Sequence, residues 1–358
     1  TTRESKTTMT RILSNRLELL SVLALLYAHI HCAFAFAFAF AFVTPMRHQQ
    51  LSSAPAPLYD SKNNNNMPAA AVKESTQTKL ADKTVFLTGA SGGLGTALAL
   101  QLAQCGVKRL ILSGRKADAL QRVKEQCLQA VVNNSNNMDV HLLVCDLSDL
   151  AQVKATAREV VKLGPVDILI NNGGVSSRSP FLETALSVDE MVMQVNFFAG
   201  AAFAKALIPT MISSAKGGRV IWISSVQGLV GIPNRSSYAA SKFAVQGYTE
   251  SIRGELKSSG VTVHTVSPGY IRTNLSNSAI TGDGTAYGKT DATTAAGADP
   301  TDVAVQLLDR IVSGDEEDFT IAATFSAVAA VYLRTLCPGL LRGLLVKRFE
   351  KSRKEKSD

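Results

Sequence analysis

The sequence has few of the residues that build disulfide frameworks and zinc sites. Only five of its 358 residues are cysteines, and they form neither a CxxC pair nor any regular spacing. Of the five histidines, only His141 and His264 lie beyond residue 50. Disulfide-stabilised mini-proteins need more cysteines than this chain has, and zinc hydrolases and Ser-His-Asp hydrolases need more histidines. We therefore expect buried free thiols, two structural histidines and no metal site.

Charged residues are also scarce, at 18% of the chain, and much of the net charge of +8 comes from the two ends. The last twelve residues contain six basic and three acidic side chains, and the first eighteen contain four basic and two acidic ones. This distribution argues against a nucleic-acid partner. Each basic cluster adjoins apolar sequence, an arrangement typical of segments beside a membrane surface. A solvated charged tail is the alternative for the C-terminal cluster.

The one long uncharged run lies near the beginning of the sequence. Residues 19–46 contain no Asp, Glu, Lys or Arg, and this exceeds the ~18 residues that indicate a spanning helix or secretory signal. We interpret 1–46 as a signal peptide or membrane anchor, which implies membrane association and entry into the endoplasmic reticulum. Residues 41–45 also resemble the signal junction of leaders for complex plastids, the alternative compartment. The polar segment 47–79 is interpreted as a linker or transit segment.

From residue 80 onward, short β-branched runs alternate with helix-length segments. This pattern predicts a doubly wound parallel sheet of Rossmann type, an α/β single domain over 80–325, followed by an apolar and then basic tail at 326–358. The predicted strands are 84–88, 110–113, 140–145, 166–170, 220–224 and 261–266. The predicted helices are 94–104, 117–130, 188–213 and 236–258.

A glycine-rich turn joins the first predicted strand to the first predicted helix. Glycines allow a sharp turn and close approach to a pyrophosphate, and the helix N-terminus then supplies N–H donors. The glycine spacing is GxxxGxG rather than GxGxxG, so a plain tight turn is the alternative. The candidate cofactor contacts in this turn are Thr88, Gly89, Ser91, Gly93, Leu94 and Gly95.

Three later strand ends carry further candidate cofactor contacts. Arg115 follows the second strand, where a cation accommodates the 2′-phosphate of NADP(H) and an acid would select NAD; a solvated arginine is the alternative. Asp146 ends the third strand, where it either receives an adenine amino group or caps a helix. Asn172 and Gly173 belong to the turn 171–174 after the fourth strand, at the edge where ligands bind in this topology.

The chemistry-bearing motif is Tyr238-Ala-Ala-Ser-Lys242, whose spacing puts Tyr238 and Lys242 on one helical face. A free tyrosine has a pKa near ~10, and a nearby ammonium and a nicotinamide cation would lower that pKa. Ser225, at the end of the fifth strand, is positioned to hydrogen-bond a substrate carbonyl. Asn196 lies within a long apolar helix, where an amide needs partners; an ordinary polar helix position is the alternative.

In this order, the motifs resemble those of the short-chain dehydrogenase/reductase family over residues 80 to about 325. The resemblance implies hydride transfer between NADP(H) and a carbonyl or alcohol. It implies that Tyr238 is the proton donor or acceptor, while Lys242 lowers its pKa and binds the nicotinamide ribose. It also implies that Ser225 orients the carbonyl and that Asn196 supports a water relay.

The same resemblance carries further expectations. It implies cofactor contacts by Ile271 and Thr273, in the sequence Ser267–Ser276, and a homo-oligomer, either a dimer or a tetramer. Gly173 departs from the more frequent alanine, a minor change at a turn governed by its backbone.

Segments 267–276, 279–281, 291–295 and 331–336 resemble one member of the family more closely. That member looks like a membrane-associated reductase, for which a role on acyl- or alkyl-dihydroxyacetone phosphate has been proposed, so the resemblance implies a lipidic carbonyl substrate. Its leader is unlike residues 1–79, so its compartment does not carry over. The apolar tail, interrupted by Arg334 and Arg342, favours an interfacial helix with snorkelling arginines. A pocket wall or dimer surface is the alternative.

Two other functions compete with a membrane-associated NADPH-dependent reductase. A plastid 3-ketoacyl-carrier-protein reductase is favoured if the leader is a plastid one. A non-catalytic NADP-binding regulatory or scaffold protein is the alternative of another class. The intact set of Ser225, Tyr238 and Lys242 argues against a scaffold, which has no need of all three.

Overall fold

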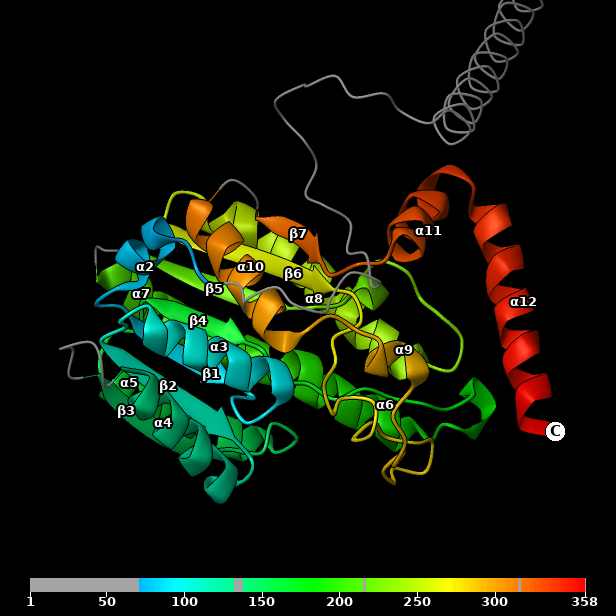
Figure 1. The fold of residues 1–358 in the computed structure, drawn as a ribbon, viewed down its shortest axis with the longest axis horizontal. Helices are drawn as coiled ribbons and strands as arrows, with labels where there is room; N and C mark the ends of the chain where they lie inside the picture. Colours follow the sequence, from blue (N-terminus) through cyan, green and yellow to red (C-terminus); the bar gives the residue numbers. More distant parts are fainter. Residues whose placement is uncertain (1–70, 132–137, 215–216, 315–316, 358) are drawn as a thin grey trace, which may run out of the picture. The chain divides into compact units, whose positions relative to one another are not determined.

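A seven-stranded parallel sheet forms the centre of the computed structural model, which describes residues 71–131, 138–214, 217–314 and 317–357. The strand order is β3-β2-β1-β4-β5-β6-β7, as Figure 1 shows, and the doubly wound fold class is confirmed. The strands are β1 (Thr84–Thr88), β2 (Arg109–Gly114), β3 (Asp139–Val144), β4 (Ile168–Asn171), β5 (Gly218–Ile223), β6 (Val261–Pro268) and β7 (Asp318–Ile321). The predicted leader and residues 47–70 of the predicted linker lie outside the described residues.

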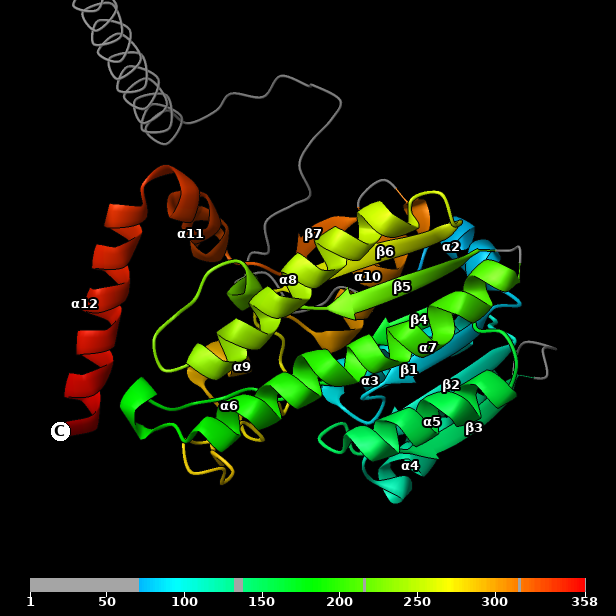
Figure 2. The same ribbon diagram turned by 180° about the vertical axis from the view of Figure 1, so that it is seen from behind.

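Helices cover both faces of the sheet because its strands are apolar throughout. In β1 every residue is buried, and alternate side chains join opposite clusters: Val85 and Leu87 on one face, Phe86 on the other. The first face carries α3 (Gly93–Gln104), α4 (Ala117–Val131) and α10 (Pro300–Ser313), seen in front in Figure 1. The opposite face carries α5 (Leu150–Lys162), α7 (Ala199–Ser213) and α8 (Ser236–Leu256), seen in front in Figure 2.

A short helix that the sequence did not predict precedes β1. Helix α2 (Glu74–Leu80) belongs to the segment interpreted as a linker, but it packs against α10. Val72 and Leu80 are buried in the core, and the Thr76 hydroxyl donates to Asp309 Oδ1 at 2.6 Å. The folded unit therefore begins before residue 80, the boundary that the strand pattern predicted.

The long helix predicted over 188–213 is interrupted. It consists of α6 (Leu186–Met193), one π-helical turn (Gln194–Phe198) and α7. Among the described residues, this is the one helix long and apolar enough to cross a membrane. Half of its most apolar window is buried, and α7 packs on α5 and on the sheet. We therefore regard it as a core helix.

Two helices, α11 (Phe325–Leu336) and α12 (Pro338–Ser357), form the tail after β7. No residue of α11 is fully buried. Arg334 is exposed, and its guanidinium lies 4.6 Å from the Phe243 ring centroid and donates to the Leu229 carbonyl at 3.0 Å. The snorkelling of the tail arginines at a membrane stays a prediction. Cys337, between the two helices, is exposed and free, whereas the other described cysteines are buried as expected.

Candidate active site

The turns after β1 and β4 lock together at the carboxyl edge of the sheet. The Thr88 hydroxyl accepts from the backbone N–H groups of Asn172 and Gly173, at 3.1 and 3.0 Å. The Asn172 amide donates back to the carbonyls of Thr88 and Gly89, at 3.0 and 3.2 Å. The strand order places β1 and β4 side by side, so the two predicted turns form one surface.

Glycine is required in this surface at two positions. Gly89 has φ +64°, and a Cβ there would lie 2.6 Å from the Gly173 Cα. A Cβ on Gly95 would collide with the Gly89 carbonyl. Helix α3 begins at Gly93 with no side-chain cap and no acidic residue in its first turn. The free N–H groups at this end and the open glycine backbone fit the pyrophosphate of a dinucleotide.

Ser91 and Arg115 flank this surface on the β2 side. A Cβ on Gly114 would lie 3.0 Å from the Ser91 hydroxyl, so the end of β2 adjoins the glycine-rich turn. Arg115 follows directly and is exposed, and no ion pair links it to any residue in the described part of the chain. A phosphate group beside Ser91 would be within reach of its charge, so the residues present fit NADP(H).

Asp146 is not the cap of α5, one of the two interpretations that the sequence allowed. Asp149 is the cap, accepting from Ala151 N at 2.8 Å and Gln152 N at 3.2 Å. Asp146 Oδ1 instead accepts from the backbone and hydroxyl of Ser148, at 2.9 and 2.8 Å. The half-buried Asp146 carboxylate thus lies at the ligand edge of the sheet, and the adenine contact is the interpretation that remains.

Asn196 lies in the π-helical turn and is buried. Its Oδ1 accepts from Val175 N at 2.8 Å, and its Nδ2 donates to the Val175 carbonyl and to the Ser241 hydroxyl, both at 2.9 Å. These bonds tie the 171–174 turn to α8. The site therefore depends on a helix irregularity of a kind that is frequent at functional sites and that the sequence did not reveal.

Tyr238, Lys242 and Ser225 are brought together at the start of α8, and all three are buried. Lys242 Nζ donates to the Ile223 carbonyl at 2.8 Å and lies 5.7 Å from the centroid of the Tyr238 ring. Ser225 caps the short 3₁₀ turn after β5 by accepting from Gln227 N at 3.1 Å, and it also hydrogen-bonds the Tyr238 side chain.

The pKa of Tyr238 is raised in the protein alone, and the lowering expected from a nicotinamide cation stays a prediction. Burial is the largest cause, while the hydrogen bond to Ser225 and the charges of Arg235 and Arg178 act to lower this pKa. Burial also lowers the pKa of Lys242 to about 8, so this ammonium is a weaker source of positive charge than the sequence suggested. Among the protein's own groups, the lowering effect comes from Ser225 and the two arginines.

The last two predicted cofactor contacts lie on the segment after β6. Thr273 packs on the glycine-rich turn, since a Cβ on Gly93 would lie 2.6 Å from its methyl group. Ile271 pairs with Ala298 in an isolated parallel bridge and packs partly against the core. The structure therefore places Thr273 at the start of α3, with Ile271 two residues earlier on the same segment.

Comparisons with known proteins agree with this geometry. A family model described as short chain dehydrogenase matches residues 83–283. The chain is 41% identical to Dehydrogenase/reductase SDR family member 7B of Xenopus tropicalis over 278 residues, which is 77% of this chain and 89% of the relative. It belongs to the short-chain dehydrogenase/reductase family. The chain is 42% identical to Dehydrogenase/reductase SDR family protein 7-like of Anopheles gambiae, and the match covers 75% of this chain and 84% of the relative.

Solved structures of this family show the same fold. A Burkholderia phymatum short-chain dehydrogenase/reductase in complex with NAD has TM-score 0.62 and 25% identity, with 73% of this chain and 96% of the other covered. A metagenomic short-chain oxidoreductase in complex with NADP has TM-score 0.55 and 26% identity, with 69% and 100% covered. The chain is thus a short-chain oxidoreductase, and its structural relatives hold either nicotinamide dinucleotide.

The sequence did not identify Arg178 or Arg235, which this short-chain dehydrogenase/reductase places beside Tyr238. Both form ion pairs with Asp291, at 2.8 and 3.0 Å. The one available signal was the position of Arg235, three residues before Tyr238 and directly before the helix that carries it.

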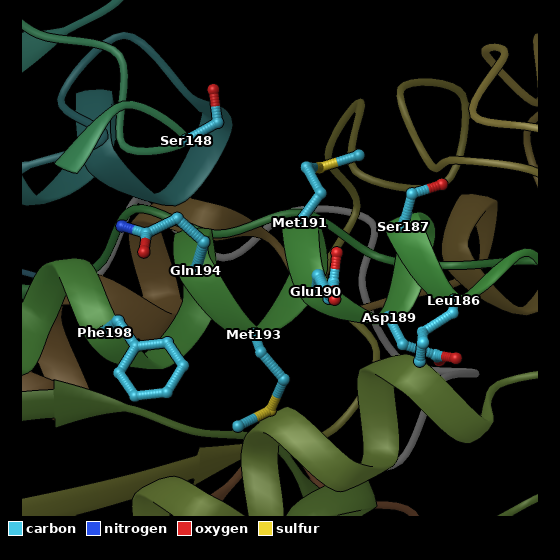
Figure 3. Close-up of a pocket in the computed structure, with 9 residues that line it drawn as sticks. All are labelled: Ser148, Leu186, Ser187, Asp189, Glu190, Met191, Met193, Gln194 and Phe198. Atoms are coloured by element: carbon cyan, nitrogen blue, oxygen red, sulfur yellow. The ribbon is translucent and has the colours of Figure 1, made fainter.

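A hollow of about 640 Å³ lies elsewhere, along α6 and the π-helical turn, and none of the candidate catalytic side chains lines it. In Figure 3, Met191 and Ser187 point to one side of the helix, and Met193 and Phe198 point to the other. This open hollow is a surface feature of the helix and does not belong to the candidate active site.

Proposed function

We propose that the chain is an NADPH-dependent carbonyl reductase of lipidic ketones, such as acyl- or alkyl-dihydroxyacetone phosphate. The observation that carries this proposal is the buried group of Ser225, Tyr238 and Lys242, next to a glycine-rich turn flanked by the exposed Arg115. The turns after β1 and β4 would hold the dinucleotide, Arg115 would hold its 2′-phosphate and Asp146 its adenine.

Reduction of a ketone needs a hydride at the carbonyl carbon and a proton at the oxygen. The bound nicotinamide supplies the hydride. Tyr238 gives its hydroxyl proton to the carbonyl oxygen, and Ser225, which already bonds the Tyr238 side chain, donates a hydrogen bond to that oxygen. The burial that raises the pKa of Tyr238 keeps the phenol protonated and suits it to act as an acid in this direction.

Lys242 and Asn196 support Tyr238. One of the three Lys242 donors is bonded to the Ile223 carbonyl, which leaves two for the ribose hydroxyls. Lys242, whose pKa is about 8, would support the return of the proton to Tyr238. Asn196 would hold the water relay in place through its bonds to Val175 and Ser241. Thr273 and Ile271 would hold the nicotinamide end of the cofactor.

A lipidic substrate and a membrane location are supported by the tail. Several large apolar side chains of α11 and α12 are about half exposed, and α12 carries a basic run. The most exposed of these are Tyr332, Leu340 and Val346. We propose that the tail lies on a membrane surface and that residues 1–46 give entry to the endoplasmic reticulum or, alternatively, a complex plastid. We also propose a dimer or tetramer, as the family resemblance implies.

The test is NADPH oxidation by the full chain with a panel of ketones that includes acyl-dihydroxyacetone phosphate and its deacylated form. We expect Tyr238→Phe to lower kcat by about 10²- to 10⁴-fold, because only the proton donor is removed. Tyr248→Phe is the matched control, since Tyr248 lies on the same helix and packs on Phe197 and Trp222. Equal activity of the Tyr238→Phe variant and the wild type would falsify the mechanism.

A further inference from the structure

Three segments that border the active site meet at a single carboxylate. Asp291 Oδ2 accepts from Arg178 Nε at 2.8 Å and from Arg235 Nη2 at 3.0 Å. The side chains of Arg178, Arg235 and Asp291 are only 9%, 10% and 17% exposed. Two buried guanidinium groups therefore share one acid, so this cluster carries an excess positive charge inside the protein.

The two arginines differ in how many of their donors are used. Arg178 contacts Asp291 through both Nε and Nη2, and its Nη1 donates to the Ser176 hydroxyl and to the Ser177 carbonyl. Ser177 in turn accepts from Tyr238 N at 3.2 Å. Arg178 thus clamps its own segment to Asp291 and to the start of α8, and its hydrogen-bonding capacity is nearly exhausted.

Arg235 has unused capacity. A guanidinium has five N–H donors, yet in the described part of the chain Arg235 has one side-chain acceptor, Asp291. Burial and the charge of Arg178 both lower the pKa of Arg235. No Arg235 nitrogen is among the fully buried side-chain atoms that lack a hydrogen-bond partner in the described part of the chain, so its unused donors reach solvent, where an anion can accept from them. Asp291 is already held by Arg178, so a second arginine is not needed to neutralise it.

The free side of Arg235 is close to the reacting position. Arg235 is the N-cap of α8, three positions ahead of Tyr238, and its carbonyl accepts from Ala239 N at 2.8 Å, so one turn of the chain joins the two residues. The charge of Arg235 acts on the hydroxyls of both Tyr238 and Tyr270. An anionic group near a carbonyl that faces Tyr238 would therefore meet Arg235.

We propose that Arg235, oriented by Asp291 and Arg178, binds an anionic group of the ketone substrate, a phosphate monoester or a carboxylate. This inference rests on the proposed reductase function, because it names the substrate class of the same site. A planar guanidinium matches such groups with two parallel hydrogen bonds, and burial strengthens them. The anion also balances the excess charge of the cluster, and it fixes which carbonyl of the substrate faces Tyr238.

The experiment compares ketones that differ only in the anion, with the full chain and NADPH. One pair is dihydroxyacetone phosphate and dihydroxyacetone; a second is acetoacetate and acetone, which distinguishes a carboxylate from a phosphate. We expect Arg235→Gln to lower the ratio of kcat/KM for the anionic over the neutral ketone by about 10- to 100-fold, mainly through the KM of the anionic ketone. The effect of the lost charge on Tyr238 is common to both ketones and cancels in this ratio. Arg235→Lys keeps the positive charge but loses the planar pair of N–H donors, so the preference for the anionic over the neutral ketone should fall by about tenfold.

Arg253→Gln is the matched control, because Arg253 is also on α8, is 15% exposed and is paired with Asp318. It should lower stability without changing the preference for anionic ketones. If Arg235→Gln does not fold, Arg235→Lys decides the outcome. The proposal is overturned if Arg235→Gln lowers kcat/KM equally for neutral and anionic ketones, or if the wild type prefers the neutral ketone. Arg235 would then have only a structural role in holding its segment to Asp291.

Calorimetry separates this inference from the proposed function. Binding of dihydroxyacetone phosphate to the wild type with NADP⁺ present should be lost in Arg235→Gln. If the wild type binds the phosphate compound through Arg235 but reduces no ketone, the reductase function fails and the subsite stands. If the wild type reduces neutral ketones and binds no anionic one, the function stands and the subsite is refuted.

Discussion

Replacing Lys242 by methionine should make the protein more stable at neutral pH while abolishing its activity. Lys242 is 4% exposed, and burial lowers the pKa of its ammonium from 10.5 to about 8. A difference of that size corresponds to about 3 kcal/mol by which burial of the charged form destabilises the native state. Methionine has a similar unbranched stem but no charge. It loses the hydrogen bond to the Ile223 carbonyl, which costs about 1 kcal/mol, so we expect a net gain of about 2 kcal/mol at pH 7.

The pH dependence gives the sharper measurement. Below pH 8 both folded and unfolded wild type hold the Lys242 proton, so the full penalty is present. Between pH 8 and 10.5 the unfolded state binds more protons than the native state, so the stability of the wild type rises with pH. At pH 9.5 about 2 kcal/mol of the penalty should be gone, and the advantage of Lys242→Met should fall to about zero. The lost hydrogen bond cancels in this comparison of the two pH values.

Urea denaturation of both proteins at pH 7 and pH 9.5 measures the four free energies of unfolding. Lys205→Met, which replaces an exposed lysine on α7, is the control and should differ from the wild type by the same amount at both pH values. The reasoning is refuted if Lys242→Met is less stable than the wild type at pH 7. It is refuted equally if the difference between Lys242→Met and the wild type does not change between the two pH values.

Three further predictions concern the cofactor edge of the sheet. Arg115→Asp should lower the ratio of kcat/KM for NADPH over NADH by about 10- to 100-fold, and an unchanged ratio would contradict the 2′-phosphate assignment. Gly95→Ala forces a methyl group onto the Gly89 carbonyl and should lower the free energy of unfolding by about 1–3 kcal/mol in thermal denaturation. The methyl group of Gly173→Ala is close mainly to the tip of a leucine side chain, so this variant should lose less than about 1 kcal/mol. Asp149→Ala removes the N-cap of α5 and should lower the free energy of unfolding by about 1 kcal/mol. Asp146→Ala should instead weaken NADP(H) binding in a fluorescence titration. If Asp146→Ala lowers stability and Asp149→Ala weakens binding, the roles of the two acids are exchanged.

The sheet was predictable because burial on both faces leaves its strands apolar without interruption. Both ends of the strand 84–88 were predicted correctly, and the other five predicted strands were placed to within about two residues; β7 was not among the predicted strands. The π-helical turn at 194–198 was not predictable, since one extra residue in an apolar stretch leaves no periodic trace. Helix α2 was missed because seven residues inside a polar segment carry too little pattern for a helix assignment.

The order of the motifs along the sequence predicted much of the candidate site, whereas contacts between distant segments could not be predicted. The glycine-rich turn, Ser225 and the Tyr238–Lys242 pair each follow or precede a predictable element, so the topology brings them to one edge. Asp291 is 113 residues from Arg178 and 56 from Arg235, and nothing in the local sequence indicates that the three meet. The direction of the Tyr238 pKa also depends on burial, which is a property of the folded chain.

The π-helical turn fixes the number of residues between α6 and α7. Each residue of a regular helix advances the chain by about 100°. A π-helical turn takes up one residue more than an α-helical turn, so α6 and α7 keep their relative orientation across it. Deleting one residue within 194–198 would restore a continuous α-helix and leave Phe203 and Leu207 in the core, but it would remove the wide turn that holds Asn196. The loss would therefore fall on the bonds of Asn196 to Val175 and Ser241 and not on the packing of α7.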